Sequence, residues 1–269
     1  MKISPMKFVA TIVALILILL SCGRTPEGDS SENVKDSSTV KDTVVIIKDS
    51  IAADRSDSLF SGAYQGIFPC PDCDGIQQTI LFNADKTYKQ EQVLWGKNLL
   101  PKIQGGTWKF VDGKIEMMQN GKPAIELVKN KDTLYAVSID GIQVNHSSKY
   151  FLTKRTLACE NPIWVKKQKE GVDFDALGNE PFWSLEIDKQ KSISFKLADW
   201  KKPITVPAEK PVIVKDSTMY TLKSDTTKWT ITIFPEFCND GMSDYLYQYK
   251  VNVNYNGVKY KGCGVVLSK

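Results

Sequence analysis

Residues 104–141 decide the fold and read QGGTWKFVDGKIEMMQNGKPAIELVKNKDTLYAVSIDG. The stretch contains short runs in which apolar and polar residues alternate, which is the pattern of a β-strand with one buried face. The runs are separated by Asp112-Gly113, Asn120-Gly121, Asn130-Lys131 and Asp140-Gly141, pairs that tolerate the positive φ of tight hairpin turns. The stretch therefore predicts four antiparallel strands and no helix.

The same pattern extends on both sides of this stretch, over a domain that we place at residues 60–155. Its predicted strands cover residues 62–67, 76–83, 86–94, 104–111, 114–119, 123–129, 132–138 and 149–154. Eight short strands with hairpin connections are typical of an up-and-down β-barrel or a β-sandwich.

A second all-β domain is predicted at residues 174–269, after a linker at residues 156–173 that contains the turn-forming Asn161-Pro162. Alternation is clearest from Tyr245 to Tyr255, where tyrosines and valines line one face of a predicted strand. Asn256-Gly257 then predicts a hairpin into the last strand. We expect a small barrel or sandwich here.

The N-terminus resembles a bacterial lipoprotein signal. Lys2 and Lys7 accompany the 13-residue apolar run Phe8–Leu20, which fits the core of a signal peptide and is too short to span a bilayer. The run leads into Leu-Ser-Cys-Gly, similar to the lipobox in which the cysteine is acylated. We expect residues 1–21 to be removed and Cys22 to carry palmitate-like acyl chains. Gly23 then favours the outer membrane over the inner one, by resemblance to enteric sorting rules. We expect the periplasmic face, while the acidic Glu27 and Asp29 leave export to the cell surface open.

Residues 22–59 are predicted to be a disordered tether. Residues 23–59 contain eight acidic residues against five basic ones and seven serines, with little apolar surface to bury. The exception is Val44–Ile47, a short β-branched run that is able to pair with a sheet edge.

The composition excludes several classes of protein. A net charge of +4 without a dense basic stripe argues against nucleic-acid binding. The single histidine, His146, excludes sites that need two histidines, including most zinc hydrolases and di-iron centres. We find no nucleophile, paired-carboxylate or phosphate-loop motif. We therefore expect no enzyme and no obligatory cofactor.

Five cysteines follow Cys22, and an oxidising envelope favours pairing among them. Cys238 and Cys263 lie in the same predicted domain and are expected to form a disulfide. The bridge encloses 26 residues and contributes about 3–4 kcal/mol in the chain-entropy model. The state of Cys159 stays open.

Cys70-Pro71-Asp72-Cys73 (CPDC) closes too short a loop for a strong entropic staple. Two thiolates suit a soft metal ion, Cu(I) or Zn(II), while a redox-sensing loop and an oxidised pair that fixes a turn are further possibilities. A thioredoxin-like catalyst is less favoured, because a strand-like run follows the motif in place of a helix. Asp72 and Asp74 also repel a thiolate.

The residues around this motif resemble the N-terminal domain of the NlpE family. The resemblance lies in Tyr64–Ile76 (YQGIFPCPDCDGI), Asp85–Tyr88 (DKTY) and Gly96-Lys97, and it extends from residue 60 to about 155. It implies a lipocalin-like barrel with the cysteine pair on its rim, so that Cys70 and Cys73 become candidate copper ligands. It also implies an outer-membrane lipoprotein linked to copper tolerance and to activation of an envelope-stress sensor kinase.

The second domain departs from the OB-fold of the best-known family member. Gly178–Trp183 (GNEPFW), Cys238–Asp244 (CNDGMSD) and Gly262–Gly264 (GCG) resemble a family of uncharacterised envelope lipoprotein domains. This resemblance implies that Cys238 and Cys263 are the domain's own pair. Because the second domain differs from that of the best-known member, the family's signalling partner does not carry over to this chain by resemblance alone.

We therefore expect a lipoprotein held in the membrane by Cys22, which binds or senses in the copper and envelope-stress class. Its partner is expected to be a sensor kinase or another envelope protein. Two alternatives stay open. A lipocalin-like carrier of a small apolar ligand requires a continuous apolar cavity. A thiol redox protein requires an exposed, activated cysteine.

Overall fold

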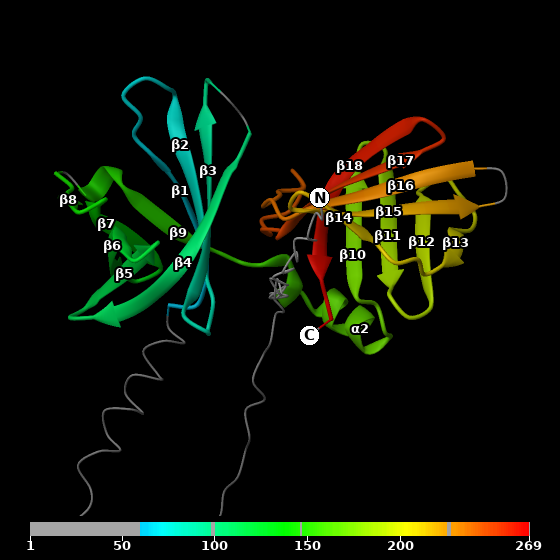
Figure 1. Cartoon of the computed structure of the whole chain (residues 1–269), viewed down its shortest axis with the longest axis horizontal. Helices are drawn as coiled ribbons and strands as arrows, with labels where there is room; N and C mark the ends of the chain where they lie inside the picture. Colours follow the sequence, from blue (N-terminus) through cyan, green and yellow to red (C-terminus); the bar gives the residue numbers. More distant parts are fainter. Residues whose placement is uncertain (1–59, 98–99, 146, 225–226, 269) are drawn as a thin grey trace, which may run out of the picture.

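The computed structural model describes residues 60–97, 100–145, 147–224 and 227–268. This part consists of two antiparallel β-sheets joined by a short helical segment, and Figure 1 shows them side by side. The expected all-β class is confirmed. The signal peptide, the tether with Val44–Ile47, and His146 lie outside the described residues. None of the described helices is long and apolar enough to cross a membrane.

The first sheet closes into an eight-stranded barrel. Its strands are β1 (Gly62–Phe68), β2 (Gly75–Phe82), β3 (Thr87–Trp95), β4 (Lys102–Val111), β5 (Lys114–Gln119), β6 (Lys122–Asn130), β7 (Thr133–Ile139) and β9 (Phe151–Arg155). Neighbours in sequence pair from β1 to β7, and β9 then pairs with both β7 and β1. The short β8 (Ile142–Gln143) adds to β7, and the 3₁₀ turn η1 (Ser147–Lys149) precedes β9. The predicted up-and-down barrel is confirmed.

Tight turns set the order of the strands. Asp112-Gly113, Asn120-Gly121, Asp140-Gly141 and Asn256-Gly257 each have two residues with φ between 50° and 79°. This conformation twists in the sense of the flanking strands, and it is the reason for glycine in the second position.

Aromatic side chains fill a large part of the barrel interior. Trp108 is almost fully buried, packs edge to face on Phe82 with the ring centroids 5.6 Å apart, and donates a hydrogen bond from Nε1 to the Asn83 carbonyl at 3.1 Å. Tyr64 also packs edge to face on Phe82. These inward-facing side chains form the first hydrophobic core.

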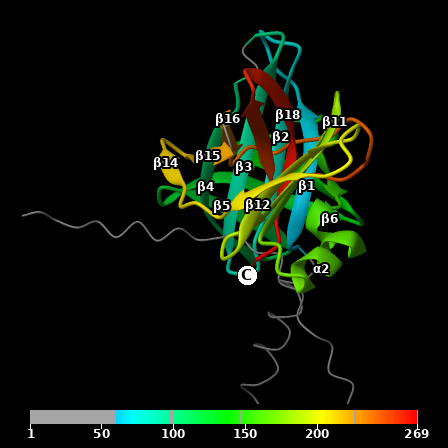
Figure 2. The ribbon, with the colours of Figure 1, turned by 90° about the vertical axis from the view of Figure 1, so that its right-hand side faces the viewer.

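The expected linker contains two helical segments, η2 (Ala158–Glu160) and α2 (Pro162–Lys169). The pair Asn161-Pro162 begins the helix α2, since the Asn161 side chain accepts a hydrogen bond from the Ile163 amide at 3.0 Å and proline occupies the first helical turn. Trp164 is buried and donates to Asp175 at 3.0 Å. Figures 1 and 2 show α2 beside the C-terminus, where Gln168 donates to the Leu267 carbonyl.

The second sheet is a single curved sheet around its own core. Its strands are β10 (Phe174–Asn179), β11 (Phe182–Asp188), β12 (Ser192–Leu197), β13 (Ile204–Pro207), β14 (Val212–Val214), β15 (Ser217–Ser224), β16 (Thr227–Phe234), β17 (Tyr249–Tyr255) and β18 (Val258–Val266). β10 pairs with β18 in the middle, and β13 and β14 form the two edges. The predicted strand from Tyr245 is shorter than expected, because β17 begins only at Tyr249.

A third apolar cluster joins the two sheets. Ala63 and Leu81 contribute from the barrel, while Leu157 and Trp164 come from the connection and Leu246 from the segment before β17. Arg155 also donates to the Asp244 carbonyl at 3.1 Å. The two sheets are therefore packed against each other and are not independent units on a loose linker.

Charged side chains of β3 lie at the margin of this contact. Glu91 is buried and accepts a hydrogen bond from the Phe237 amide at 2.8 Å, while the Lys89 ammonium lies 4.2 Å from the centroid of the Phe237 ring. Burial lowers the pKa of Lys89 to about 8, although Glu91 and Glu236 partly offset the shift. Burial raises the pKa of the Glu91 carboxyl, and the bond from Phe237 opposes that rise.

Lys89 predicts a rise in stability at alkaline pH. Its folded-state pKa lies below the unfolded value, so between about pH 8 and 10 the unfolded chain binds one more proton, and stability increases by at most about 1.4 kcal/mol per pH unit. Tyrosine hydroxyls also ionise at about pH 10 and affect stability there. Denaturant unfolding of the wild type and of Lys89→Met at several pH values separates the contribution of Lys89 from theirs. Equal slopes in the two proteins would contradict the assignment.

Candidate functional site

The CPDC motif forms the loop between β1 and β2, at one end of the barrel. The two strands separate after Phe68 pairs with Ile76, and the loop residues are half-buried or exposed. The Asp74 amide donates to the Trp95 carbonyl at 3.0 Å, which ties this loop to the end of β3. The motif therefore stands on the rim of the barrel, where the resemblance to the NlpE family places it.

Cys70 and Cys73 are joined by a disulfide, with Cα atoms 5.3 Å apart. Pro69 and Pro71 restrict the backbone on both sides of Cys70. The structure therefore shows the oxidised loop, in which the sulfurs are not thiolates and do not act as metal ligands.

Asp72 lies between the two cysteines and faces both sulfur and a cation. Its Oδ1 lies 3.5 Å from Sγ of Cys70, and its Oδ2 forms an ion pair with the Lys97 ammonium. This contact lowers the pKa of the Asp72 carboxyl, so that the side chain stays ionised in mildly acidic solution.

Gly96 allows the β3–β4 loop to approach the motif this closely. Its φ is +77°, and a Cβ at this position would collide with the Asp74 carboxylate. In the sequence, Gly96-Lys97 is informative only as part of the NlpE resemblance, and its contact with Asp74 is visible only in the structure. The contact between the two loops follows from the pairing of β2 with β3, which brings Gly75 opposite Trp95.

The donor set suits a metal ion once the disulfide is reduced. Among the described residues, Cys70, Asp72 and Cys73 are the group whose potential ligand atoms all lie within 4.8 Å of one another. Two sulfurs and one oxygen at this spacing fit a thiophilic ion better than Ca²⁺ or Mg²⁺, which take oxygen ligands.

Glutamines line the barrel interior toward the same end. Gln90 and Gln92 donate to Gln78 at 2.8 Å and 3.2 Å, and Gln104 donates to Gln90 at 2.6 Å. They share the inward face with Ile80, as alternation along the strands requires. These amides interrupt the apolar lining that a carrier of a small apolar ligand requires.

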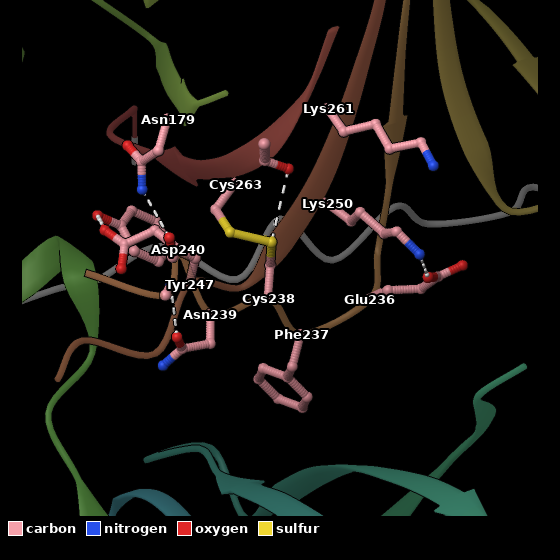
Figure 3. Close-up of a disulfide and its surroundings, with 12 residues drawn as sticks. Asn179, Glu236, Phe237, Cys238, Asn239, Asp240, Tyr247, Lys250, Lys261 and Cys263 are labelled. Atoms are coloured by element: carbon pink, nitrogen blue, oxygen red, sulfur yellow. Dashed lines mark hydrogen bonds and ion pairs between the residues drawn. A yellow bond between two sulfur atoms is a disulfide. The ribbon is translucent and has the colours of Figure 1, made fainter. Parts of the chain in front are cut away.

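The second cysteine pair lies in the other sheet. Cys238 and Cys263, expected to pair, form a disulfide with Cα atoms 5.5 Å apart, and Cys263 is 1% exposed. Figure 3 shows Phe237, the residue before Cys238, pointing toward the strands of the barrel. Cys159 is buried in the cluster between the two sheets, and Cys22 lies outside the described residues.

The loop after Cys238 is held by Asp240. Its carboxylate accepts hydrogen bonds from the Ser243 amide at 2.8 Å, the Met242 amide at 3.1 Å and the Tyr247 hydroxyl at 3.0 Å. Although burial disfavours the ionised form, these bonds lower the pKa of Asp240. Asn179 also donates to the Asp240 carbonyl at 2.6 Å (Figure 3). Because its oxygens are occupied by donors of the chain itself, this loop is a structural turn.

Comparison with known proteins supports the first domain's resemblance. Residues 64–149 match the family model of the NlpE N-terminal domain. A proposed lipoprotein from Shewanella oneidensis is 23% identical, with 37% of this chain and 94% of that chain covered and a TM-score of 0.31. The Cpx pathway activator NlpE from Escherichia coli is 12% identical, with 75% and 95% covered and a TM-score of 0.29. No curated protein matches the sequence.

The two disulfides predict different effects on stability. Cys238→Ser/Cys263→Ser opens a loop with a sequence separation of 25 and should lower the free energy of unfolding by about 3–4 kcal/mol. Cys70→Ser/Cys73→Ser opens a separation of 3, for which the same model gives about 2 kcal/mol. Urea unfolding without reductant measures both. A larger loss from the Cys70/Cys73 variant would refute this ranking.

Proposed function

We propose that this chain, whose first domain is NlpE-like, is a non-catalytic envelope lipoprotein that binds Cu(I) through Cys70 and Cys73 and takes part in envelope-stress sensing. The observation that carries the proposal is the position of the CPDC loop on the exposed rim of a barrel that matches the NlpE N-terminal domain model. The nearby carboxylate and sulfurs provide a donor set suited to a thiophilic metal.

Metal binding requires reduction of the loop. A dithiol reductant supplies two electrons and two protons, so the Cys70–Cys73 bond breaks, two thiols form and the reductant becomes a disulfide. Each thiol then loses its proton when its sulfur binds the ion. Thus the loop takes up metal only under conditions that have first reduced it.

Cu(I) fits the loop for reasons of softness and geometry. Thiolates are the softest ligands that a protein offers, and two of them bind Cu(I) without a histidine. Pro69 and Pro71 limit the backbone freedom that ligation would otherwise remove. A thiol oxidoreductase is less well supported, since β2 follows the motif and none of the helices in the described part of the chain begins at the sulfurs.

The proposal includes membrane attachment through Cys22. Residues 1–21 act as a cleaved signal peptide and residues 22–59 as a tether, so that the two folded domains reach a sensor kinase or another envelope protein from the periplasmic face of the outer membrane. Acyl chains supply the anchor, since each buried methylene contributes about 0.8 kcal/mol.

If Cys22 is acylated, its replacement should change how the protein divides between membrane and soluble fractions. Cys22→Ala should abolish acylation, so the protein is released from membranes or accumulates as an uncleaved precursor. Labelling with a fatty-acid analogue and membrane fractionation measure the outcome, with Cys159→Ala as the cysteine control. Wild-type processing and labelling of Cys22→Ala would refute the lipobox assignment.

If the CPDC loop binds copper, a variant without its two cysteines should lose one high-affinity Cu(I) site. The reduced full chain in detergent is titrated with Cu(I) against a competing chelator, and Cys70→Ser/Cys73→Ser should lose at least tenfold in affinity. Since reduction also opens the other disulfide, Cys238→Ser/Cys263→Ser is the matched control and should keep the site. Equal affinity of wild type and Cys70→Ser/Cys73→Ser would leave the loop a structural turn.

A further inference from the structure

We infer that the ion pair between Lys97 and Asp72 makes the reduced CPDC loop selective for Cu(I) over Zn(II), because it neutralises the carboxylate that would serve Zn(II) as a third ligand. The inference rests on the proposed metal binding and assigns a specificity role to a lysine on another loop. Lys97 is a positioning residue, since it acts on the ion through Asp72.

The Asp72 carboxylate is shared between two neighbours. Its Oδ1 lies 3.5 Å from Sγ of Cys70, while Oδ2 contacts the Lys97 ammonium. The carboxylate and the two sulfurs all lie within 4.8 Å of one another, so that one ion is able to contact all three once the disulfide is reduced. Lys97 contacts Oδ2, whereas Oδ1 is the oxygen beside the Cys70 sulfur, so Lys97 weakens the carboxylate as a ligand through its charge and does not block it.

The two metals respond differently to a third, oxygen ligand. Zn(II) prefers four ligands in tetrahedral geometry and accepts carboxylate oxygen beside thiolate sulfur. Cu(I) is softer and gains little from an oxygen ligand. Zn(II) also carries twice the charge, so each negative group near the sulfurs favours it more strongly. A lysine that pairs with Asp72 thus disfavours Zn(II) more than Cu(I).

Backbone contacts place Lys97 opposite Asp72. The Asp74 amide donates to the Trp95 carbonyl at 3.0 Å, and Gly96 leaves room for the Asp74 carboxylate. These contacts fix the register between the two loops immediately before Lys97. The pairing therefore follows from the positions of the two loops and not from a chance meeting of long side chains.

The expected size of the effect is modest. The Lys97 and Asp72 side chains are 43% and 73% exposed, and exposed ion pairs of this kind change an equilibrium by roughly two- to fivefold at low salt. High salt screens such a pair. Selectivity that depends on it should therefore decline as ionic strength rises.

The test compares Zn(II) and Cu(I) affinities of the reduced full chain by chelator competition at low salt. Lys97→Met should raise Zn(II) affinity about two- to fivefold and raise Cu(I) affinity by a smaller factor. Lys97→Arg should keep the wild-type ratio, because a guanidinium also pairs with a carboxylate. Adding Asp72→Asn to Lys97→Met should remove the gain, and salt of about 1 M should remove it in the single variant.

Lys102→Met is the matched control, because Lys102 is an exposed lysine at the start of β4 on the same end of the barrel. An equal gain in Zn(II) affinity from Lys102→Met would show that the effect comes from the overall charge of this end of the barrel, and it would overturn the inference. Equal shifts for Cu(I) and Zn(II) in Lys97→Met would overturn it as well. If wild type and Cys70→Ser/Cys73→Ser bind both metals equally, the proposed function itself fails.

Discussion

The alternation of side chains along β3 is the constraint on which the rest of the structure depends. Tyr88 and Gln90 point into the barrel, whereas Lys89 and Glu91 point outward and meet Phe237 of the second sheet. A slip of one residue in the pairing of β2 with β3 would exchange these faces. It would place charges in the barrel and glutamines at the domain contact, and the rim contacts would be lost with it.

The contact between the sheets combines apolar burial with charged groups that oppose it. Burial lowers the pKa of Lys89 and raises the pKa of Glu91, because it disfavours the charged form of each. Burying these charges therefore costs free energy, which the apolar cluster beside them offsets. The region around Tyr247 serves the same contact. Leu246 and Tyr247 pack between the sheets, and the chain then enters β17, where Val251 and Val253 belong to the second core.

The sequence predicts the barrel well, because its hairpin turns carry strong local signals such as Asn120-Gly121. It does not predict α2, since the helix is short and its asparagine and proline also suit a turn. Nor does alternation tell an inward from an outward glutamine, so the Gln78–Gln90 network is visible only in the closed barrel. The CPDC motif is recognisable in the sequence, whereas the pairing of Asp72 with Lys97 depends on strand register and is visible only in the structure.

The two disulfides occupy environments that suit different roles. Thiol–disulfide exchange requires a thiolate to reach a sulfur, and Cys70 and Cys73 lie on a rim loop, whereas Cys263 is 1% exposed beneath the segment that carries Phe237. Both sulfurs of the rim pair belong to half-buried residues, whereas the other pair has one half-buried cysteine, Cys238, and one buried cysteine, Cys263. Because β1 and β2 continue to pair below the loop, opening that bond leaves the barrel closed and the domain contact in place. The rim is thus able to change its redox state and its ligands while the rest of the molecule keeps its structure.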